Sequence, residues 1–237
     1  MGLIYEYLTY DGVSSLDFGV KISGSGTFDA PVRDIEAISI PGRNGDLHID
    51  NGRFNNIDIT YPAYITEHFS KNFDAFKAFL LSKHGYKRLV DTYHPDHYRL
   101  AIFNNALTPD MTPRNLAGSF DLVFSCDPRR FLISGDRAVE VTTGSVLKNQ
   151  TLFDAKPLIR VYGTGTITVG GISIVVNSAN VYTDLDSELE EAYKGTTNCN
   201  GNITLTNGQF IKLAPGLNTI TFSNFSKVEI TPRWWTV

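Results

Sequence analysis

The sequence is poor in the residues that build metal, redox or covalent sites. Its 237 residues include two cysteines, two methionines and five histidines. Cys126 and Cys199 lie far apart in the chain, and neither belongs to a C-x-x-C pair, so the spacing of a zinc or redox motif is missing. We expect both thiols to stay reduced, because cytoplasmic proteins seldom keep disulfides.

The chain also lacks an excess of basic residues and any long apolar run. The net charge of −4 and the isoelectric point near 5.7 argue against a protein that binds duplex DNA. The first residues, MGLIYEYLTYDG, contain no basic segment followed by an apolar run, so we expect no signal peptide. Glu6 stands where a myristoylation signal requires Ser or Thr. We therefore expect a protein made in the cytoplasm without a membrane anchor.

The glycine-rich segment SIPGRNGDLHIDNGRFNN, residues 39–56, does not fit a phosphate-binding loop. No Gly-Lys-Ser/Thr follows its glycines, so the lysine that reaches the phosphates in a P-loop is missing. A second segment, GTGTITVGG from Gly163, approaches a dinucleotide-binding fingerprint. Thr168 stands where the third glycine is required, and a strand is expected after it where the fingerprint needs a helix. Both segments are therefore expected to be turns between strands.

Two histidines and a run of acids are the remaining candidates for a metal site. His94 and His97 flank Pro-Asp, which predicts a turn between strands, and no other Cys or His cluster offers a third ligand. In DLDSELEEAY the acids alternate from Asp184, but Leu189 stands where an EF-hand loop needs glycine. We expect a solvated acidic segment there. No G-x-S-x-G elbow is present, so no catalytic residue, cofactor or metal site is predicted.

What the sequence does contain is typical of a β-rich globular protein. Hydrophobic residues make up 42% and charged residues 19%, and there are 20 glycines, 15 phenylalanines and 11 tyrosines. One helix is predicted, because Phe69, Phe73, Phe76 and Leu80 recur at helical spacing. Gly85 follows as a stop signal.

Strand patterns occupy most of the rest. Ile57, Ile59 and Tyr61 alternate with polar residues, and GSFDLVFSC places Phe120, Leu122 and Phe124 on one face. After Pro157 short strands separated by Gly, Asn or Pro-Gly turns predict a β-sandwich. We predict a mainly β fold with one substantial helix in two domains, residues 1–133 and 157–237, joined by a linker over 134–156 with one or two short strands.

Trp234 and Trp235, in PRWW, are the most distinctive pair near the end of the chain. Adjacent strand residues face opposite sides, so one indole is expected in the core and the other in a contact or facing outward. An outward Trp can stack on a sugar or anchor an interface. Packing in the core or an interface is favoured over ligand stacking, because Trp is common in both without a ligand.

Several segments occur together in one order along the chain: SIPGRNGDLHIDNGRFNNIDITY, KRLVDTYHPDHYRLAIF, GSFDLVFSCDPRRF, KPLIRVYGTG, LDSELEEAY, PGLNTIT and PRWW. This series resembles the distal tail protein of siphophages that infect Gram-positive bacteria or persist as prophages, a family often called Dit. The resemblance covers essentially the whole chain.

The resemblance implies a tail-tube-like N-terminal domain that forms the wall of a ring and a galectin-like C-terminal β-sandwich. It implies a virion structural protein of the tail tip or baseplate, made in the host cytoplasm and not an enzyme. Six copies would form a hexamer that joins the tail tube protein to the tail-associated lysin or fibre protein. Receptor-binding proteins dock on the C-terminal domains in some phages, and the tape measure protein and DNA pass through the ring without specific binding.

Two details of the resemblance bear on candidate sites. Gly42, Arg43, Asn44 and Gly45 are expected on a loop that reaches a neighbouring subunit or the adjoining tube ring. Larger family members carry an inserted carbohydrate-binding module, for which the short turns after Pro157 leave no room. The alternative function is a module that binds host cell-wall saccharide through the C-terminal sandwich, with Trp234 or Trp235 as the stacking residue.

Overall fold

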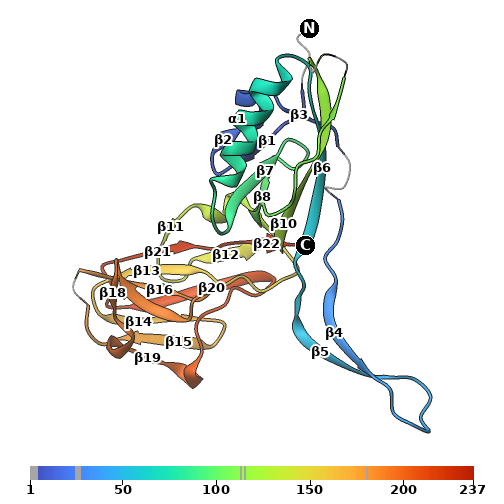
Figure 1. The fold of residues 1–237 in the computed structure, drawn as a ribbon. Coiled ribbons are helices and arrows are strands. Elements are labelled where there is room, and N and C mark those ends of the chain that lie inside the picture. The colour runs from blue at the N-terminus through green and yellow to red at the C-terminus, as the bar shows by residue number, and fades with distance from the viewer. Residues whose placement is uncertain (1–4, 25–27, 113, 115, 180) are drawn as a thin grey trace. The chain divides into compact units, whose positions relative to one another are not determined.

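The computed structural model describes residues 5–24, 28–112, 114, 116–179 and 181–237, which form two compact units (Figure 1). The first unit is Met1–Arg130 together with Val237, and the second is Phe131–Thr236. Strands dominate both, and α1 (Phe69–Leu81) is the one α-helix in the described part of the chain. The predicted fold class, mainly β with one substantial helix, is confirmed. No helix in the described ranges is long and apolar enough to span a membrane.

The first unit is built on one large sheet. The strands of this unit are β1 (Leu8–Tyr10), β2 (Val13–Ser14), β3 (Lys21–Ile22), β4 (Arg33–Ile38), β5 (Leu47–Phe54), β6 (Ile57–Ile65), β7 (Lys87–Asp91), β8 (His97–Ile102), β9 (Asp110–Met111) and β10 (Gly118–Leu132). It also contains the 3₁₀ helix η1 (Ser15–Phe18). The sheet order is β2-β1-β7-β8-β10-β6-β3, with β9 also on β10, while β4 and β5 form a separate two-stranded hairpin. β6 pairs antiparallel along its whole length with residues 118–126 of β10.

The helix and the inward face of the sheet enclose the first core, as the sequence predicts. Phe69, Phe73, Phe76 and Leu80 are the buried residues of α1, and Figure 1 shows the helix lying across one face of the sheet. On β10 every second residue from Phe120 to Phe124 is buried. The phenylalanine rings of the helix and strand pack edge to face, with Phe73 and Phe120 centroids 5.0 Å apart. This arrangement adds about 1 kcal/mol per pair beyond the buried area.

The second unit is a sandwich of two sheets around one core. Its elements are η3 (Ile133–Asp136), β11 (Val139–Val141), β12 (Val146–Asn149), β13 (Leu158–Tyr162), β14 (Gly165–Val169), β15 (Ile172–Val176), β16 (Tyr182–Asp186), β17 (Glu191–Lys194), β18 (Thr197–Asn198), η4 (Asn200–Asn202), β19 (Ile203–Leu205), η5 (Thr206–Gly208), β20 (Gly216–Ser223), β21 (Lys227–Thr231) and β22 (Trp235–Thr236). The sheets have the orders β11-β21-β13-β16-β17-β18 and β12-β20-β14-β15-β19. Inward residues of both sheets form the second core.

Residues 134–156, expected to be a linker with short strands, belong to this sandwich. β11 pairs antiparallel with β21, and β12 pairs with β20, so each extends one of the two sheets. Val141 is buried in the second core. The polar composition of the segment hides this role, because edge strands carry their polar residues outward and need few apolar residues inward.

The glycine-rich segment at Gly163 forms a hairpin, as predicted. β14 and β15 pair antiparallel through Gly170 and Gly171, both of which have positive φ. Gly165 has a different role, because a Cβ there would lie 2.1 Å from the Ser223 carbonyl oxygen. The glycine therefore permits the close approach of β14 and β20.

The prediction of a solvated acidic segment is wrong for its first two acids. Asp184 and Asp186 are only 3% and 2% exposed. Arg160 binds both carboxylate oxygens of Asp184, at 2.6 and 2.8 Å, and Arg233 binds both of Asp186, at 2.7 and 2.9 Å. The arginines that neutralise these carboxylates come from distant segments, which sequence spacing does not reveal.

Candidate functional site

The β4–β5 hairpin is the most exposed regular structure of the first unit. Every residue of β4 except Asp34 and every residue of β5 except Phe54 is exposed. Figure 1 shows the hairpin projecting away from the sheet of its own unit. A two-stranded ribbon alone is at best marginally stable in water, so this hairpin is the strongest candidate for an interaction site.

One face of the hairpin carries a stripe of aliphatic side chains. Ile38 lies opposite Leu47 in the strand register, and Ile49 lies opposite Glu36 on the same face. The exposed fractions of Ile38, Leu47 and Ile49 are 37%, 42% and 42%, and none belongs to a buried core. We call these three residues the hairpin stripe. Apolar side chains gathered on an uncovered ribbon are typical of a surface that another surface covers.

The predicted loop residues Gly42, Arg43, Asn44 and Gly45 all lie at the tip of this hairpin. The Arg43 N–H donates to the Ile40 carbonyl at 3.1 Å, and Pro41 with Gly42 at φ 79° gives the sequence and geometry of a type II turn. Gly45, at φ 82°, provides the second left-handed position. The tip is thus a preformed turn that holds the Arg43 and Asn44 side chains in the open.

The base of the hairpin is fixed by ion pairs. Arg33 Nη1 lies 3.1 Å from Asp50, and Arg53 Nε lies 2.6 Å from Asp34. The Arg33 guanidinium also stacks over the Phe54 ring at 4.8 Å. Exposed pairs of this kind contribute about 0–1 kcal/mol each. They orient the ribbon without supplying the buried area that would make it stable.

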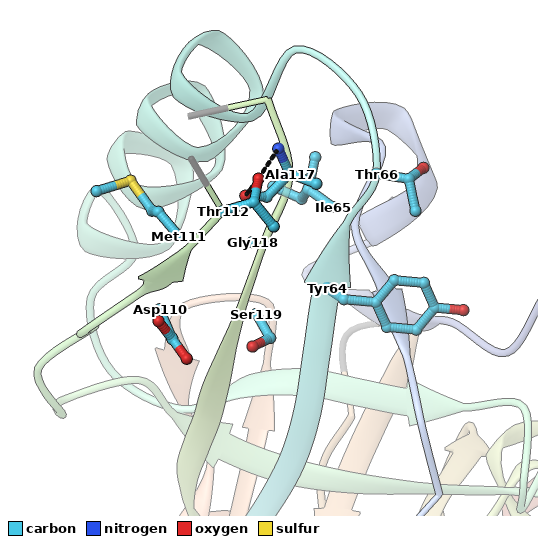
Figure 2. Close-up of a pocket in the computed structure, with 9 residues that line it drawn as sticks. All are labelled: Tyr64, Ile65, Thr66, Asp110, Met111, Thr112, Ala117, Gly118 and Ser119. Carbon is cyan, nitrogen blue, oxygen red and sulfur yellow. Dashed lines mark hydrogen bonds between the residues drawn. The ribbon is translucent and has the colours of Figure 1, made fainter. Parts of the chain in front are cut away.

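An apolar hollow of about 310 Å³ lies elsewhere on the first unit, shown in Figure 2. It is lined by residues 64–66 at the end of β6, 110–112 at β9 and 117–119 at the start of β10. The Ala117 N–H donates to Thr112 Oγ1 at 3.1 Å and closes one rim. Gly118 has no space for a side chain, since a Cβ would lie 2.6 Å from the Phe69 ring and 2.8 Å from the Asp110 carbonyl oxygen.

Sequence reasoning found the hairpin tip but missed the stripe and the hollow. Leu47 and Ile49 share the period of two that marks Ile38 and Ile40, so a signal for the stripe was present. The hollow had none, because its walls come from three segments that only the sheet brings together.

The two tryptophans face different environments, but only Trp235 belongs to a strand, β22, where the sequence predicted both in one strand. Trp234 packs against the second core. Trp235 stacks on Phe153, with ring centroids 4.3 Å apart, and its indole N–H donates to the Asp154 carbonyl at 2.9 Å. One ring face and the indole N–H of Trp235 are therefore already engaged within the second unit.

The cysteines, histidines and acids are the remaining residues that could hold a metal or act in catalysis. No group of three or more His, Cys, Asp or Glu side chains that could hold a metal occurs in the described ranges. Both cysteines are free, and burial raises the pKa of the Cys126 thiol to about 12, so this thiol is not a nucleophile at neutral pH. His94 lies on the turn between β7 and β8, and His97 is the first residue of β8. His94 Nδ1 is 3.4 Å from Asp91.

Comparisons with known proteins give matches in structure. In sequence, no protein-family model and no curated protein matches this chain. SPP1 Dit (gp 19.1), described as a paradigm of the hub adsorption apparatus in Gram-positive infecting phages, matches with a TM-score of 0.74 and 16% identity over 99% of this chain and 100% of its own. A chain of the phage P2 baseplate in its activated conformation with Ca matches with a TM-score of 0.51 and 12% identity over 96% of this chain and 97% of its own.

The same baseplate with Sr gives a TM-score of 0.50 and 12% identity, over 97% of each chain. At these identities the likeness shows the fold. The match to SPP1 Dit covers nearly the full length of both chains, so both units and their order are shared. The resemblance that the sequence motifs predicted is confirmed at this level: the chain has the fold of the phage distal tail protein Dit.

Proposed function

We propose that this protein is the structural hub of a siphophage tail tip, part of a phage or prophage tail. Six copies form a ring that joins the tail tube protein to the tail-associated lysin or fibre protein. The observation that carries the proposal is the full-length match to SPP1 Dit, a hub protein, with supporting matches to a phage baseplate. The role is structural and not catalytic.

The exposed hairpin supports assembly into a larger particle. An apolar stripe on a ribbon without a core of its own is stabilised when a neighbour covers it, by about 25 cal/mol per Å² of apolar surface. Its tip residues Gly42, Arg43, Asn44 and Gly45 then contact a neighbouring subunit or the adjoining tube ring. A ring closed by rotation uses one surface of each subunit against a different surface of the next.

The other partners follow from the hub role. Receptor-binding proteins dock on the second unit, which is a galectin-like sandwich in this proposal. The tape measure protein and then DNA pass through the ring without specific binding, which agrees with the net charge of −4. The protein thus resides in the virion after synthesis in the host cytoplasm.

The oligomeric state tests this function. Light scattering of the purified chain should give a species of six times the 26.3 kDa subunit mass, and electron microscopy should show sixfold rings. A chain that stays monomeric at high concentration and in the presence of its tail tube protein would contradict the hub.

The alternative, a module that binds cell-wall saccharide, has a separate test. Trp235 is the candidate stacking residue, but its contacts with the Phe153 ring and the Asp154 carbonyl give it a packing role. Sedimentation with purified cell wall, abolished by Trp235→Ala in a variant that still assembles, would support saccharide binding. Equal sedimentation of both forms would remove the tryptophan from that function.

A further inference from the structure

Arg99, on β8 of the first unit, is a buried arginine whose charge is unpaired among the described residues. It is 6% exposed, and alternation along β8 places its side chain on the same face as Ala101, which is fully buried in the first core. Arg99 Nη1 donates to the Pro128 carbonyl at 3.5 Å, a long hydrogen bond, and the buried Nη2 has no partner in the described ranges. Because a guanidinium does not lose its proton in a protein, Arg99 keeps a positive charge at the core.

Arg130, on β10, brings a second unused donor to the same end of the core. β10 is the neighbour of β8 in the sheet, and Arg130 lies two residues after Pro128, whose carbonyl Arg99 contacts. Arg130 Nη2 donates to the Val237 carbonyl at 2.7 Å, but its buried Nε has no partner in the segments that the structure describes. Burial lowers the pKa of the Arg99 guanidinium, and the charge of Arg130 lowers it further. Two cations therefore lie near each other, each with one N–H group left over.

The acidic residue whose charge acts on Arg99 is Asp91, but both of its carboxylate oxygens already accept other hydrogen bonds. The Tyr61 hydroxyl donates to Asp91 Oδ2 at 2.8 Å, and the His94 backbone N–H donates to Oδ1 at 2.9 Å. Within the described residues Asp91 does not reach the unused N–H group of Arg99. A buried charge is costly unless it is paired and hydrogen-bonded, so a further counter-charge is expected.

The other titratable neighbours do not supply that counter-charge. Cys126 is fully buried on the core face of β10, and burial raises its pKa to about 12, so the thiol is neutral at pH 7. His97 lies on the same face of β8 as Arg99. Burial and the charge of Arg130 lower its pKa, so it is neutral as well at pH 7. The charge that balances the two arginines therefore has to come from a bound group.

We propose that Arg99 Nη2 and Arg130 Nε bind a small inorganic oxyanion of the phosphate or sulfate class inside the first unit. A tetrahedral oxyanion offers several acceptor oxygens, and guanidinium groups bind such oxygens by short, charge-assisted hydrogen bonds. One ion satisfies both unused donors and neutralises the charge at the core. A water molecule could accept the same two hydrogen bonds, but it would leave the charge unbalanced. The site is complete within one subunit, so it is independent of the proposed ring.

The burial of both donors selects a free ion over a side chain of another protein. Neither Arg99 Nη2 nor Arg130 Nε is accessible at the surface of the folded unit. A carboxylate carried by a partner would have to bring its own backbone into the first core to reach them. A free ion needs only a transient local opening, which native proteins undergo.

Titration with inorganic phosphate tests the site in the full-length chain. Isothermal titration calorimetry should give a single phosphate per subunit. The melting temperature should rise and then follow the logarithm of the phosphate concentration, because a ligand that binds only the folded state stabilises it in this way. Sulfate should compete with phosphate for the site, and sodium chloride at the same ionic strength should not. Equal competition by chloride would overturn the assignment to oxyanions.

Substitution of each arginine separates a specific site from the general stabilising effect of phosphate, which acts through exclusion from the protein surface. Arg99→Met removes the buried charge and should weaken phosphate binding at least about tenfold, the effect of losing one charged hydrogen bond. Without phosphate it should melt no lower than the wild type, because an apolar side chain often replaces a buried charge without loss. Arg130→Met, at a partly exposed position, should weaken binding similarly and tests the site if Arg99→Met does not fold.

The matched control is Arg137→Met, at an exposed position of the second unit, which should bind phosphate as the wild type does. Equal phosphate responses of the wild type, Arg99→Met and Arg130→Met would overturn the proposal. Crystals grown with selenate give the direct measurement, since the anomalous signal of selenium should lie between the Arg99 and Arg130 guanidinium groups. A water molecule in that position, with no anomalous signal, would equally overturn it.

Discussion

Ile38 and Leu47 lie directly opposite each other on the β4–β5 hairpin, and both side chains remain exposed, by 37% and 42%. A cross-strand aliphatic pair normally stabilises a sheet by covering a core. Here neither residue belongs to a buried core in the described part of the chain. The pair therefore adds little to the free energy of folding of a single subunit. A neighbouring molecule that covered it would bury its apolar surface and gain that free energy on assembly.

The rate of trypsin cleavage in the hairpin should show whether a neighbouring molecule covers it. Arg33, Arg43 and Arg53 are all cleavage sites on the hairpin. Leu47→Glu with Ile49→Glu places two charges on the hairpin stripe and should prevent assembly. In this variant we expect rapid cleavage after Arg43, because a ribbon without a core opens readily. In wild-type rings the same cleavage should be at least about tenfold slower.

The control is the exposed Lys148 on β12 of the second unit, whose cleavage rate should not depend on assembly. Equal cleavage after Arg43 in rings and in monomers, quantified by mass spectrometry, would mean that the hairpin stays uncovered in the ring.

Removal of the Asp186 carboxylate should destabilise the second unit. Asp186 is buried and accepts two bonds from Arg233 at 2.7 and 2.9 Å. Asp186→Ala leaves that guanidinium without its partner, at a cost of about 3 kcal/mol in the free energy of unfolding. Urea unfolding followed by tryptophan fluorescence measures the change.

Asp74→Ala serves as the comparison. It removes the exposed pair with Lys77 and should change the free energy of unfolding by less than about 0.5 kcal/mol. A similar effect of both substitutions would show that burial of the Asp186 pair is energetically unimportant.

The same pair should make the protein sensitive to acid. Burial raises the pKa of the Asp186 carboxyl, but the bonds from Arg233 outweigh burial and hold the pKa below its usual value. A carboxyl with a lowered native pKa stabilises the fold above its unfolded pKa of about 3.9 and loses this contribution as pH falls through the native value.

The melting temperature of the wild type should therefore fall as the pH drops below about 4. Asp186→Asn should be less stable at neutral pH and should lose less on acidification, because residue 186 then binds no proton. Parallel pH profiles of the two proteins would assign the acid sensitivity to other carboxyls.

The two thiols should react at very different rates. Cys126 is fully buried on β10, and burial raises its pKa to about 12, whereas Cys199 is partly exposed. Iodoacetamide at neutral pH should modify Cys199 in the folded protein and Cys126 only in denaturant. Peptide mass mapping distinguishes the sites, and rapid labelling of Cys126 would indicate that the first core opens easily.

Gly165→Ala should weaken the five-stranded sheet of the sandwich. The added methyl group would lie 2.1 Å from the Ser223 carbonyl oxygen, so β14 and β20 must separate. We expect a loss of about 2 kcal/mol or more in the free energy of unfolding. Thermal melting of the purified variants measures the change. Gly201→Ala, where a Cβ meets nothing within 4 Å, should leave the melting temperature nearly unchanged.

The sequence alone determined the features that depend on local periodicity. The spacing of Phe69, Phe73, Phe76 and Leu80 fixed the buried face of α1, because 3.6 residues per turn place these rings on one side. Alternation fixed the buried face of β10, and the Pro41-Gly42 pair with Gly45 favoured a turn. The order of the motifs along the chain also predicted the Dit fold, which the match to SPP1 Dit confirms.

Only the tertiary structure decided which of these surfaces stay open. A period of two shows that Ile38, Leu47 and Ile49 share a face, but it does not reveal that the hairpin leaves the sheet and buries none of them. Likewise, the run of acids that begins at Asp184 predicted a solvated segment, yet arginines from distant segments neutralise its first two carboxylates in the folded chain. Burial and pairing depend on contacts between distant segments, and local sequence patterns do not encode those contacts.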